Sequence, residues 1–172
     1  MNNNTFVHKY IRPLIDEETV VDMTAGNGND TLFLAKYAKK VYAFDISEEA
    51  IRRSKEKCKG CENIEFIIDN HINVDLYIKG KVKLFLFNLG YLPSSDEKRI
   101  TQAEETLIAF EKAYSLLQEK GYIVITFYIG HKGGKDEYYL LNDYINKNRL
   151  QVLEAYRQNK IDSPITCIIR KP

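Results

Sequence analysis

The chain has 172 residues, a length typical of one domain, and carries 25 basic and 24 acidic side chains. Hydrophobic residues make up 44% and charged residues 28%, which excludes a disordered or fibrous protein, and the net charge of +1 does not indicate a strongly basic nucleic-acid binder. No apolar run approaches the roughly 18 residues of a membrane span, and the first residues lack the pattern of a secretory signal. We therefore expect a single domain over residues 1–172, in the cytoplasm and without a membrane partner.

Short apolar runs alternate with amphipathic segments along the chain. A short helix is expected over Phe6–Ile15, and because Pro13 lies inside it, the helix either begins near Arg12 or kinks there. Further helices are expected over Asp30–Lys39, Ile51–Lys57, Thr101–Gln118 and Asp136–Asn148. Seven runs have the Val, Ile and Phe content of buried strands: Val20–Met23, Val41–Phe44, Ile64–Ile68, Val82–Phe87, Tyr122–Phe127, Val152–Tyr156 and Ile165–Ile169.

Strands that alternate with helices form βαβ units. The pattern therefore predicts an α/β fold, with a seven-stranded, mostly parallel sheet and helices on both faces. Only a loop, residues 157–164, separates the last two runs, so we expect an antiparallel hairpin at the C-terminal end of the sheet.

A glycine-rich turn follows the first predicted strand, and an acid ends the second. Gly26 and Gly28 lie between a strand and a helix, where glycine allows a ligand to approach the backbone, and Asp45 stands where an acid binds the ribose hydroxyls of a nucleoside. Thr31 replaces the third glycine of a dinucleotide fingerprint. Because Asp22 and Asp30 make this turn anionic, it suits a cationic ligand such as S-adenosylmethionine better than a pyrophosphate.

A second group of polar residues follows the fourth predicted strand. Asn88 and Tyr91 belong to the sequence from Asn88 to Pro93, at the carboxyl end of the strand, where open α/β sheets bind ligands. The Asn88 side-chain oxygen can accept a hydrogen bond from an amine, and the Tyr91 ring can stack on a base. By itself this segment is equally consistent with an ordinary loop, but its position beside the glycine-rich turn favours function.

The cysteines do not indicate a metal or redox site. Cys58 and Cys61 have a C-x-x-C spacing, but no second ligand pair exists, and the odd total of three is typical of a reducing compartment. The basic cluster from Arg52 to Lys59 alternates with glutamates and reads as a solvated helix face. We expect phosphate contacts instead from residues nearer the carboxyl ends of the strands: Lys98, Arg99, Lys132 and Lys135.

With these residues in place, the chain resembles the small class I S-adenosylmethionine-dependent methyltransferases of the putative rRNA methylase family. The resemblance is carried by Asp22–Thr31, Phe44–Ile46, Asn70–His71, Asn88–Pro93 and Gly130–Gly134, in the same order along nearly the whole chain. Members of that family are tRNA 5-aminomethyl-2-thiouridine methyltransferases, which modify the wobble uridine. The resemblance implies a Rossmann-like class I methyltransferase fold, the cofactor S-adenosylmethionine, a tRNA substrate and a homodimer.

The motifs and the resemblance together define the candidate site residues. Asn88 and Tyr91 are the expected catalytic residues, and no metal is expected. The residues expected at the cofactor are Asp22, Thr24, Gly26, Asn27, Gly28, Asn29, Asp30, Thr31, Asp45, Ile46, Ser47, Asn70 and His71. The residues expected at the substrate are Leu89, Gly90, Leu92, Pro93, His131, Gly133 and Gly134. We expect His8, in the N-terminal segment, to be structural, with RNA contact as the alternative.

Methyl transfer from a sulfonium to an amine is a direct displacement that depends mainly on alignment, and it needs no covalent enzyme intermediate. The most consistent function is N-methylation of the aminomethyl group of the tRNA wobble uridine. Methylation of rRNA or of a small amine is an alternative within enzymes. A non-catalytic nucleoside- or RNA-binding module is the alternative of another class, since a fold does not by itself define a function.

Overall fold

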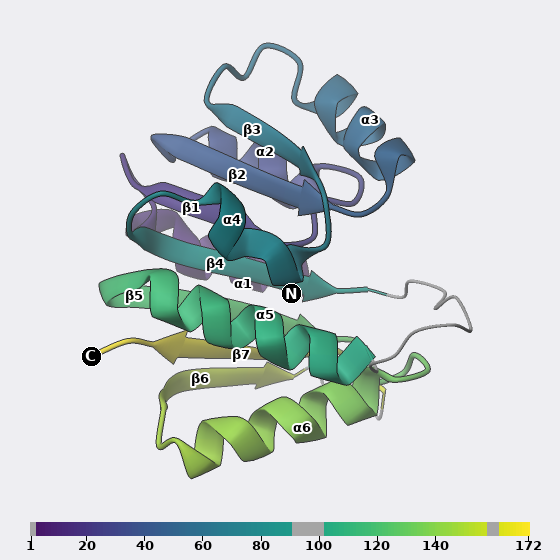
Figure 1. The fold of residues 1–172 in the computed structure, drawn as a ribbon, viewed down its shortest axis with the longest axis vertical. Coiled ribbons are helices and arrows are strands. Elements are labelled where there is room, and N and C mark those ends of the chain that lie inside the picture. Colours follow the sequence, from purple (N-terminus) through teal and green to yellow (C-terminus); the bar gives the residue numbers. More distant parts are fainter. Residues whose placement is uncertain (1–2, 91–101, 158–161) are drawn as a thin grey trace.

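The computed structural model describes residues 3–90, 102–157 and 162–172. Seven strands form one sheet in the order β3-β2-β1-β4-β5-β7-β6. The strands are β1 (Thr19–Asp22), β2 (Lys40–Asp45), β3 (Ile64–Ile68), β4 (Val82–Leu89), β5 (Leu117–Phe127), β6 (Gln151–Arg157) and β7 (Ile165–Arg170). The first five pair in parallel, whereas β7 runs antiparallel to both β5 and β6 (Figure 1), so the predicted mixed sheet and terminal hairpin are confirmed.

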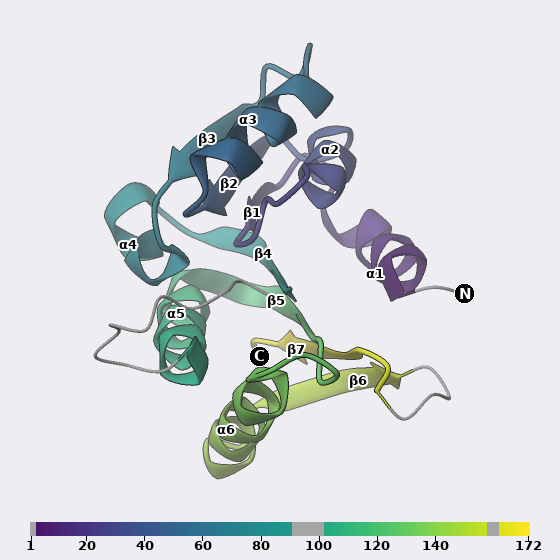
Figure 2. The same cartoon turned by 90° about the vertical axis from the view of Figure 1, so that its right-hand side faces the viewer.

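Helices cover both faces of this sheet (Figure 2). They are α1 (Asn3–Ile11), α2 (Asn29–Ala35), α3 (Glu48–Lys57), α4 (Val74–Tyr77), α5 (Gln102–Leu116) and α6 (Gly134–Lys147). One hydrophobic cluster joins one face of the sheet to α4, α5 and α6, and a second joins the opposite face to α1 and α2. Strand β4 lies at the centre, with both Phe85 and Phe87 fully buried, as expected for a continuous apolar run in a parallel sheet.

Several element boundaries differ from the sequence prediction. The first helix ends at Ile11 and continues as a 3₁₀ turn over Arg12–Leu14, because Pro13 has no N–H for a continued α-helix. Strand β5 starts at Leu117, directly after α5, with an irregular register opposite Val82 and Leu84. The 3₁₀ turn at His71–Asn73 and the one-turn α4 were not predicted, because such short segments show no periodicity.

Within the described part of the chain, no helix is long and apolar enough to cross a membrane. The same residues contain no group of three or more His, Cys, Asp or Glu side chains arranged to hold a metal ion. The Cys58 thiol instead donates to the carbonyl oxygen of Gly28 at 3.9 Å, and burial raises the pKa of this thiol. Its surroundings therefore match a structural cysteine that packs α3 against the glycine-rich turn.

Candidate active site

Side-chain alternation brings the polar ends of β1 and β4 to one face of the sheet. On β4, Phe85 and Phe87 belong to the cluster beneath α5, so the alternate residue Asn88 projects towards α1 and α2. On β1, Val20 packs in the α1–α2 cluster, so Asp22 projects to that same face. Because β1 and β4 are paired neighbours, both polar side chains lie where the glycine-rich turn leads into α2.

Asp22 anchors the glycine-rich turn from below. Its side chain is fully buried and accepts hydrogen bonds from the Thr31 hydroxyl at 2.6 Å and from the Thr24 N–H at 3.1 Å. Burial and the nearby charge of Asp30 raise the pKa of Asp22 to about 7. Between about pH 4 and pH 7, the folded protein therefore holds a proton on Asp22 that the unfolded chain has released. The stability that comes from this protonated Asp22 is lost as pH rises from about 4 to about 7.

The turn itself is held open by two glycines with positive φ, 50° at Gly26 and 77° at Gly28. Gly28 also faces α3, and a Cβ there would lie 2.8 Å from the Cα of Ser54. That contact involves backbone, which cannot swing aside, so glycine is required at this position for both conformation and space. The thiol of Cys58 and the backbone of Ser54 both lie against Gly28, so the C-terminal part of α3 packs directly on the turn.

We expect Gly28→Ala to lower the free energy of unfolding by roughly 2–4 kcal/mol, since it combines left-handed strain with a backbone clash. Gly60→Ala is the matched control, because Gly60 has a φ of 90° but nothing within 4 Å of its added Cβ. The control should lose only the conformational part, about 1 kcal/mol. Urea unfolding of both variants measures the difference, and equal losses would show that the contact with Ser54 costs nothing.

Asp45 closes the turn from β2. Its carboxylate accepts the N–H of Gly26 and the N–H of Ser47, both at 2.9 Å. A carboxylate has about four acceptor positions, so two remain for a ligand's hydroxyl groups. The side chain of Ser47 accepts the N–H of Ala50 and caps α3, while the neighbouring Ile46 is 47% exposed.

The remaining predicted cofactor residues line the same end of the sheet. Asn27 and Asn29 are exposed on the turn, and Asn29 accepts from the ammonium group of Lys57. Asn70 caps the 3₁₀ turn by accepting the Ile72 N–H at 3.0 Å, and the His71 ring lies 3.2 Å from the Met23 carbonyl oxygen. The structure therefore gathers the predicted residues of β1, β2 and β3 around one region.

Asp69 is a member of this region that the sequence interpretation missed. It directly follows β3 and accepts hydrogen bonds from Tyr77 at 2.7 Å and from Asn73 at 3.0 Å, which hold the pKa of its carboxyl below the usual value. An acid immediately after a parallel strand was the available signal, as it was for Asp45.

Asn88 is held by one hydrogen bond from its backbone and one from its side chain. Its backbone N–H donates to the Thr24 hydroxyl at 2.9 Å, and its side-chain amide donates to Asp30 Oδ2 at 3.0 Å. Tyr128 lies nearby, and burial and the charge of Asp30 raise the pKa of its hydroxyl. Among residues 3–90, 102–157 and 162–172, the buried Asn88 Oδ1 has no hydrogen-bond partner. A buried acceptor without a hydrogen-bond donor lowers the stability of the folded protein unless a ligand supplies the donor.

The loop between β5 and α6, residues 128–133, completes the site and is called the rim below. Tyr128, which the sequence interpretation also missed, follows the last residue of β5, and its carbonyl oxygen accepts the His131 N–H at 3.0 Å. A Cβ on Gly134 would lie 2.2 Å from that carbonyl oxygen, so glycine lets α6 begin against the rim. Gly133 has a φ of 84° at the start of α6, and Lys132 and Lys135 are exposed beside it.

Two other predicted substrate residues, Leu89 and Gly90, do not share the environment of Asn88. Leu89 is buried in the cluster beneath α5, on the face opposite to Asn88, whereas Gly90 is exposed. The predictions for Tyr91, Leu92, Pro93, Lys98 and Arg99 fall outside the described residues. Arg52 on α3 pairs with Glu49 at 2.8 Å on an exposed surface, which agrees with a solvated face.

The family described as putative rRNA methylase matches residues 41–171 of the chain. The chain belongs to this family. Its sequence is 34% identical over 155 residues to a chloroplastic tRNA (mnm(5)s(2)U34)-methyltransferase of Arabidopsis thaliana, covering 81% of the chain but only 52% of that longer protein. The chain thus spans about half the length of this curated relative.

Solved structures of similar size agree with this membership. A structure described as a putative methyltransferase from Streptococcus mutans, in complex with SAH, has a TM-score of 0.86 and 31% identity, covering 100% of this chain and 99% of that chain. A structure described as a putative rRNA-methylase from Clostridium thermocellum has a TM-score of 0.83 and 34% identity, covering 99% of this chain and 98% of that chain. The expected class I methyltransferase fold and the family resemblance are both confirmed.

Proposed function

We propose that the protein is an S-adenosylmethionine-dependent RNA methyltransferase that N-methylates the aminomethyl group of the wobble uridine in tRNA. The observation that carries this proposal is the buried, unpartnered Asn88 Oδ1, positioned beside a glycine-rich turn with acids around it. An oxygen acceptor at that place matches the N–H of an amine. The Arabidopsis relative, named for an mnm5s2U34 reaction, supports the same substrate class.

The residues around the turn fit S-adenosylmethionine. Asp45 would bind the ribose hydroxyls through its two remaining acceptor positions, and the Gly26–Gly28 backbone would line the methionine part of the ligand. Asp69, Ile46, Asn70 and His71 would surround the nucleoside end. When bound, this cofactor supplies an electrophilic methyl group on a sulfonium, and the carbon–sulfur bond breaks as the nitrogen–carbon bond forms.

We expect Asp45→Ala to weaken S-adenosylmethionine binding by about 1–3 kcal/mol, or roughly 5- to 150-fold in Kd, because ribose hydroxyls would lose their acceptor. The variant also frees the N–H groups of Gly26 and Ser47, so its unfolding should be measured beside its calorimetric titration. Glu62→Ala, a change of an exposed acid on the loop before β3, is the control. An unchanged Kd in the Asp45 variant would contradict the ribose assignment.

On the acceptor side, this chain's residues orient an amine and leave its lone pair available. The amine must be neutral when it attacks, so Asn88 Oδ1 would accept one N–H while the lone pair faces the methyl group. After methylation the nitrogen is an ammonium, and it loses one proton to water or to a histidine of the rim such as His131. Tyr91 would stack on the base, and Lys98, Arg99, Lys132 and Lys135 would contact phosphates.

We propose that residues 1–172 form one domain. We also propose a cytoplasmic location, because Cys58, Cys61 and Cys167 are all free thiols. The family resemblance also leads us to propose a homodimer. Sedimentation of the purified protein measures this oligomeric state.

The test of function uses labelled S-adenosylmethionine and tRNA that bears or lacks the aminomethyl uridine, followed by mass analysis of the nucleosides. Methyl on the aminomethyl nitrogen of the first tRNA alone is the expected result. Equal labelling of both tRNAs, or label on ribose, on a ring carbon or only on rRNA, would replace this function with the rRNA alternative. Cofactor binding without transfer to any RNA or small amine would favour the non-catalytic module.

A further inference from the structure

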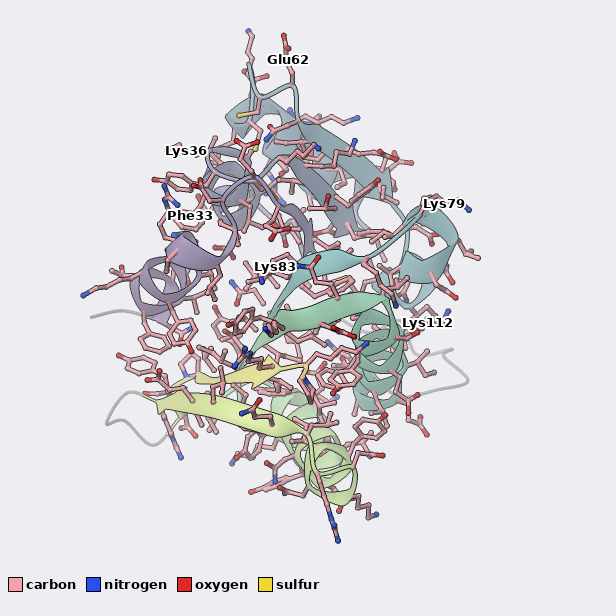
Figure 3. All side chains as sticks on the ribbon, turned by 90° about the vertical axis from the view of Figure 1, so that its left-hand side faces the viewer. Phe33, Lys36, Glu62, Lys79, Lys83 and Lys112 are labelled. Carbon is pink, nitrogen blue, oxygen red and sulfur yellow. The ribbon has the colours of Figure 1, made fainter. Side chains whose placement is uncertain are left out.

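The N-terminal helix reaches into the acceptor site through one side chain. His8 of α1 places its Nε2 atom 2.6 Å from Asp30 Oδ1, at the first turn of α2. The His8 ring also lies flat on Phe33, with centroids 3.9 Å apart and planes 6° apart. Asp30 and Phe33 are three residues apart on α2, so one helix face holds both the carboxylate and the ring. Figure 3 shows Phe33 on the side of α2 that adjoins α1.

The second oxygen of Asp30 acts on Asn88. Asp30 Oδ2 accepts the Asn88 side-chain amide at 3.0 Å, and the Asp30 side chain is only 11% exposed. A carboxylate can only accept hydrogen bonds, so it requires the Asn88 NH₂ group to face it. The amide oxygen must then point the other way, which is where Oδ1 lies buried without a partner in the described structure.

We propose that His8 and Asp30 are positioning residues for methyl transfer, which hold the Asn88 amide so that its oxygen faces the acceptor amine. This inference rests on the proposed role of Asn88. It gives Asp30 a function other than the cofactor contact expected from sequence, and it makes α1 a part of the active site. Both residues lie outside the segment 41–171 that the family match covers.

Docking of α1 does not depend on His8. Val7 and Ile11 are buried against the sheet, and Asn3 exchanges hydrogen bonds with Thr126 at 3.3 Å and Thr166 at 2.8 Å. A variant at His8 should therefore keep the helix in place while releasing Asp30. That separation allows a positioning role to be distinguished from a structural one.

The experiment compares His8→Phe, which keeps a ring against Phe33 but has no N–H donor, with His8→Gln, which restores an N–H near the same place. Lys9→Ala, an exposed change on the same helix, is the matched control. The first measurement is the ¹⁵N–¹H resonance of the Asn88 side-chain amide, assigned by its absence in Asn88→Ala. We expect His8→Phe to shift it and to speed its exchange with water several-fold, and His8→Gln and Lys9→Ala to leave it near the wild-type position.

The second measurement is kcat with aminomethyl-bearing tRNA at saturating cofactor. We expect His8→Phe to lower kcat about 10-fold with the cofactor Kd unchanged, and to have less than a twofold effect in the Asn88→Ala background. Equal losses in both backgrounds, or an unmoved amide resonance, would overturn the proposal. If the wild-type protein methylates no tRNA, the proposed function fails, while the amide resonance still decides whether His8 and Asp30 hold Asn88.

Discussion

Asn88→Ala is expected to lower kcat for methyl transfer by about 100-fold or more and to leave the Kd for S-adenosylmethionine within about twofold. The Asn88 amide contacts Asp30 and presents an unpartnered oxygen, so its removal deletes the group that would align the amine. Alignment is realised in the transition state, and its loss therefore falls on kcat. Single-turnover rates with aminomethyl-bearing tRNA, beside calorimetric titration of the cofactor, separate the two quantities.

The variant also removes a hydrogen bond from the mostly buried Asp30, which should cost about 1–3 kcal/mol of stability. Urea unfolding sets the conditions under which the variant is fully folded during the assay. Asn148→Ala is a matched control, because the Asn148 side chain only donates to the Tyr144 carbonyl oxygen at an exposed helix end. An intact kcat with weakened cofactor binding would move Asn88 to the cofactor site.

The methylation rate should rise nearly tenfold for each pH unit between about pH 6 and pH 8 under single-turnover conditions. An alkylammonium has an ordinary pKa near 10, as in lysine, and only its neutral form has the lone pair that attacks. The slope thus belongs to the substrate amine. Asn88→Ala, although slower, should keep the same slope, since it changes alignment and not the protonation of the amine.

This profile distinguishes amines from other acceptors. A flat rate from pH 6 to pH 8 would indicate a hydroxyl or carbon acceptor, or an amine that binds already neutral. Asp22 titrates in the middle of this range, with a pKa of about 7, and its carboxyl group accepts hydrogen bonds from Thr31 and Thr24 in the turn. Cofactor affinity should therefore be measured at each pH, so that saturation is maintained throughout.

The sequence determined the sheet and much of the site because these depend on local pattern. Apolar runs of strand length, separated by amphipathic segments, predict a parallel sheet whatever its neighbours are, and the carboxyl ends of its strands then lie together. Gly26, Asp45 and Asn88 follow from this rule, since Asp45 and Asn88 lie at the ends of β2 and β4 and Gly26 lies in the turn that follows β1. Strict alternation along β4 also predicts that Asn88 lies on the face opposite Phe87.

Only the tertiary structure decided what Asp30 and His8 do. In the sequence, Asp30 is one more acid in a cofactor turn, and His8 is a lone histidine on a short helix. Their contact of 2.6 Å depends on how α1 crosses to α2, which is set by burial of Val7 and Ile11 and by the hydrogen bonds of Asn3 with Thr126 and Thr166. Those partners are far apart along the chain, and their packing leaves no periodic signal. Local pattern therefore defined where the site lies, and long-range packing defined which side chains hold its acceptor residue.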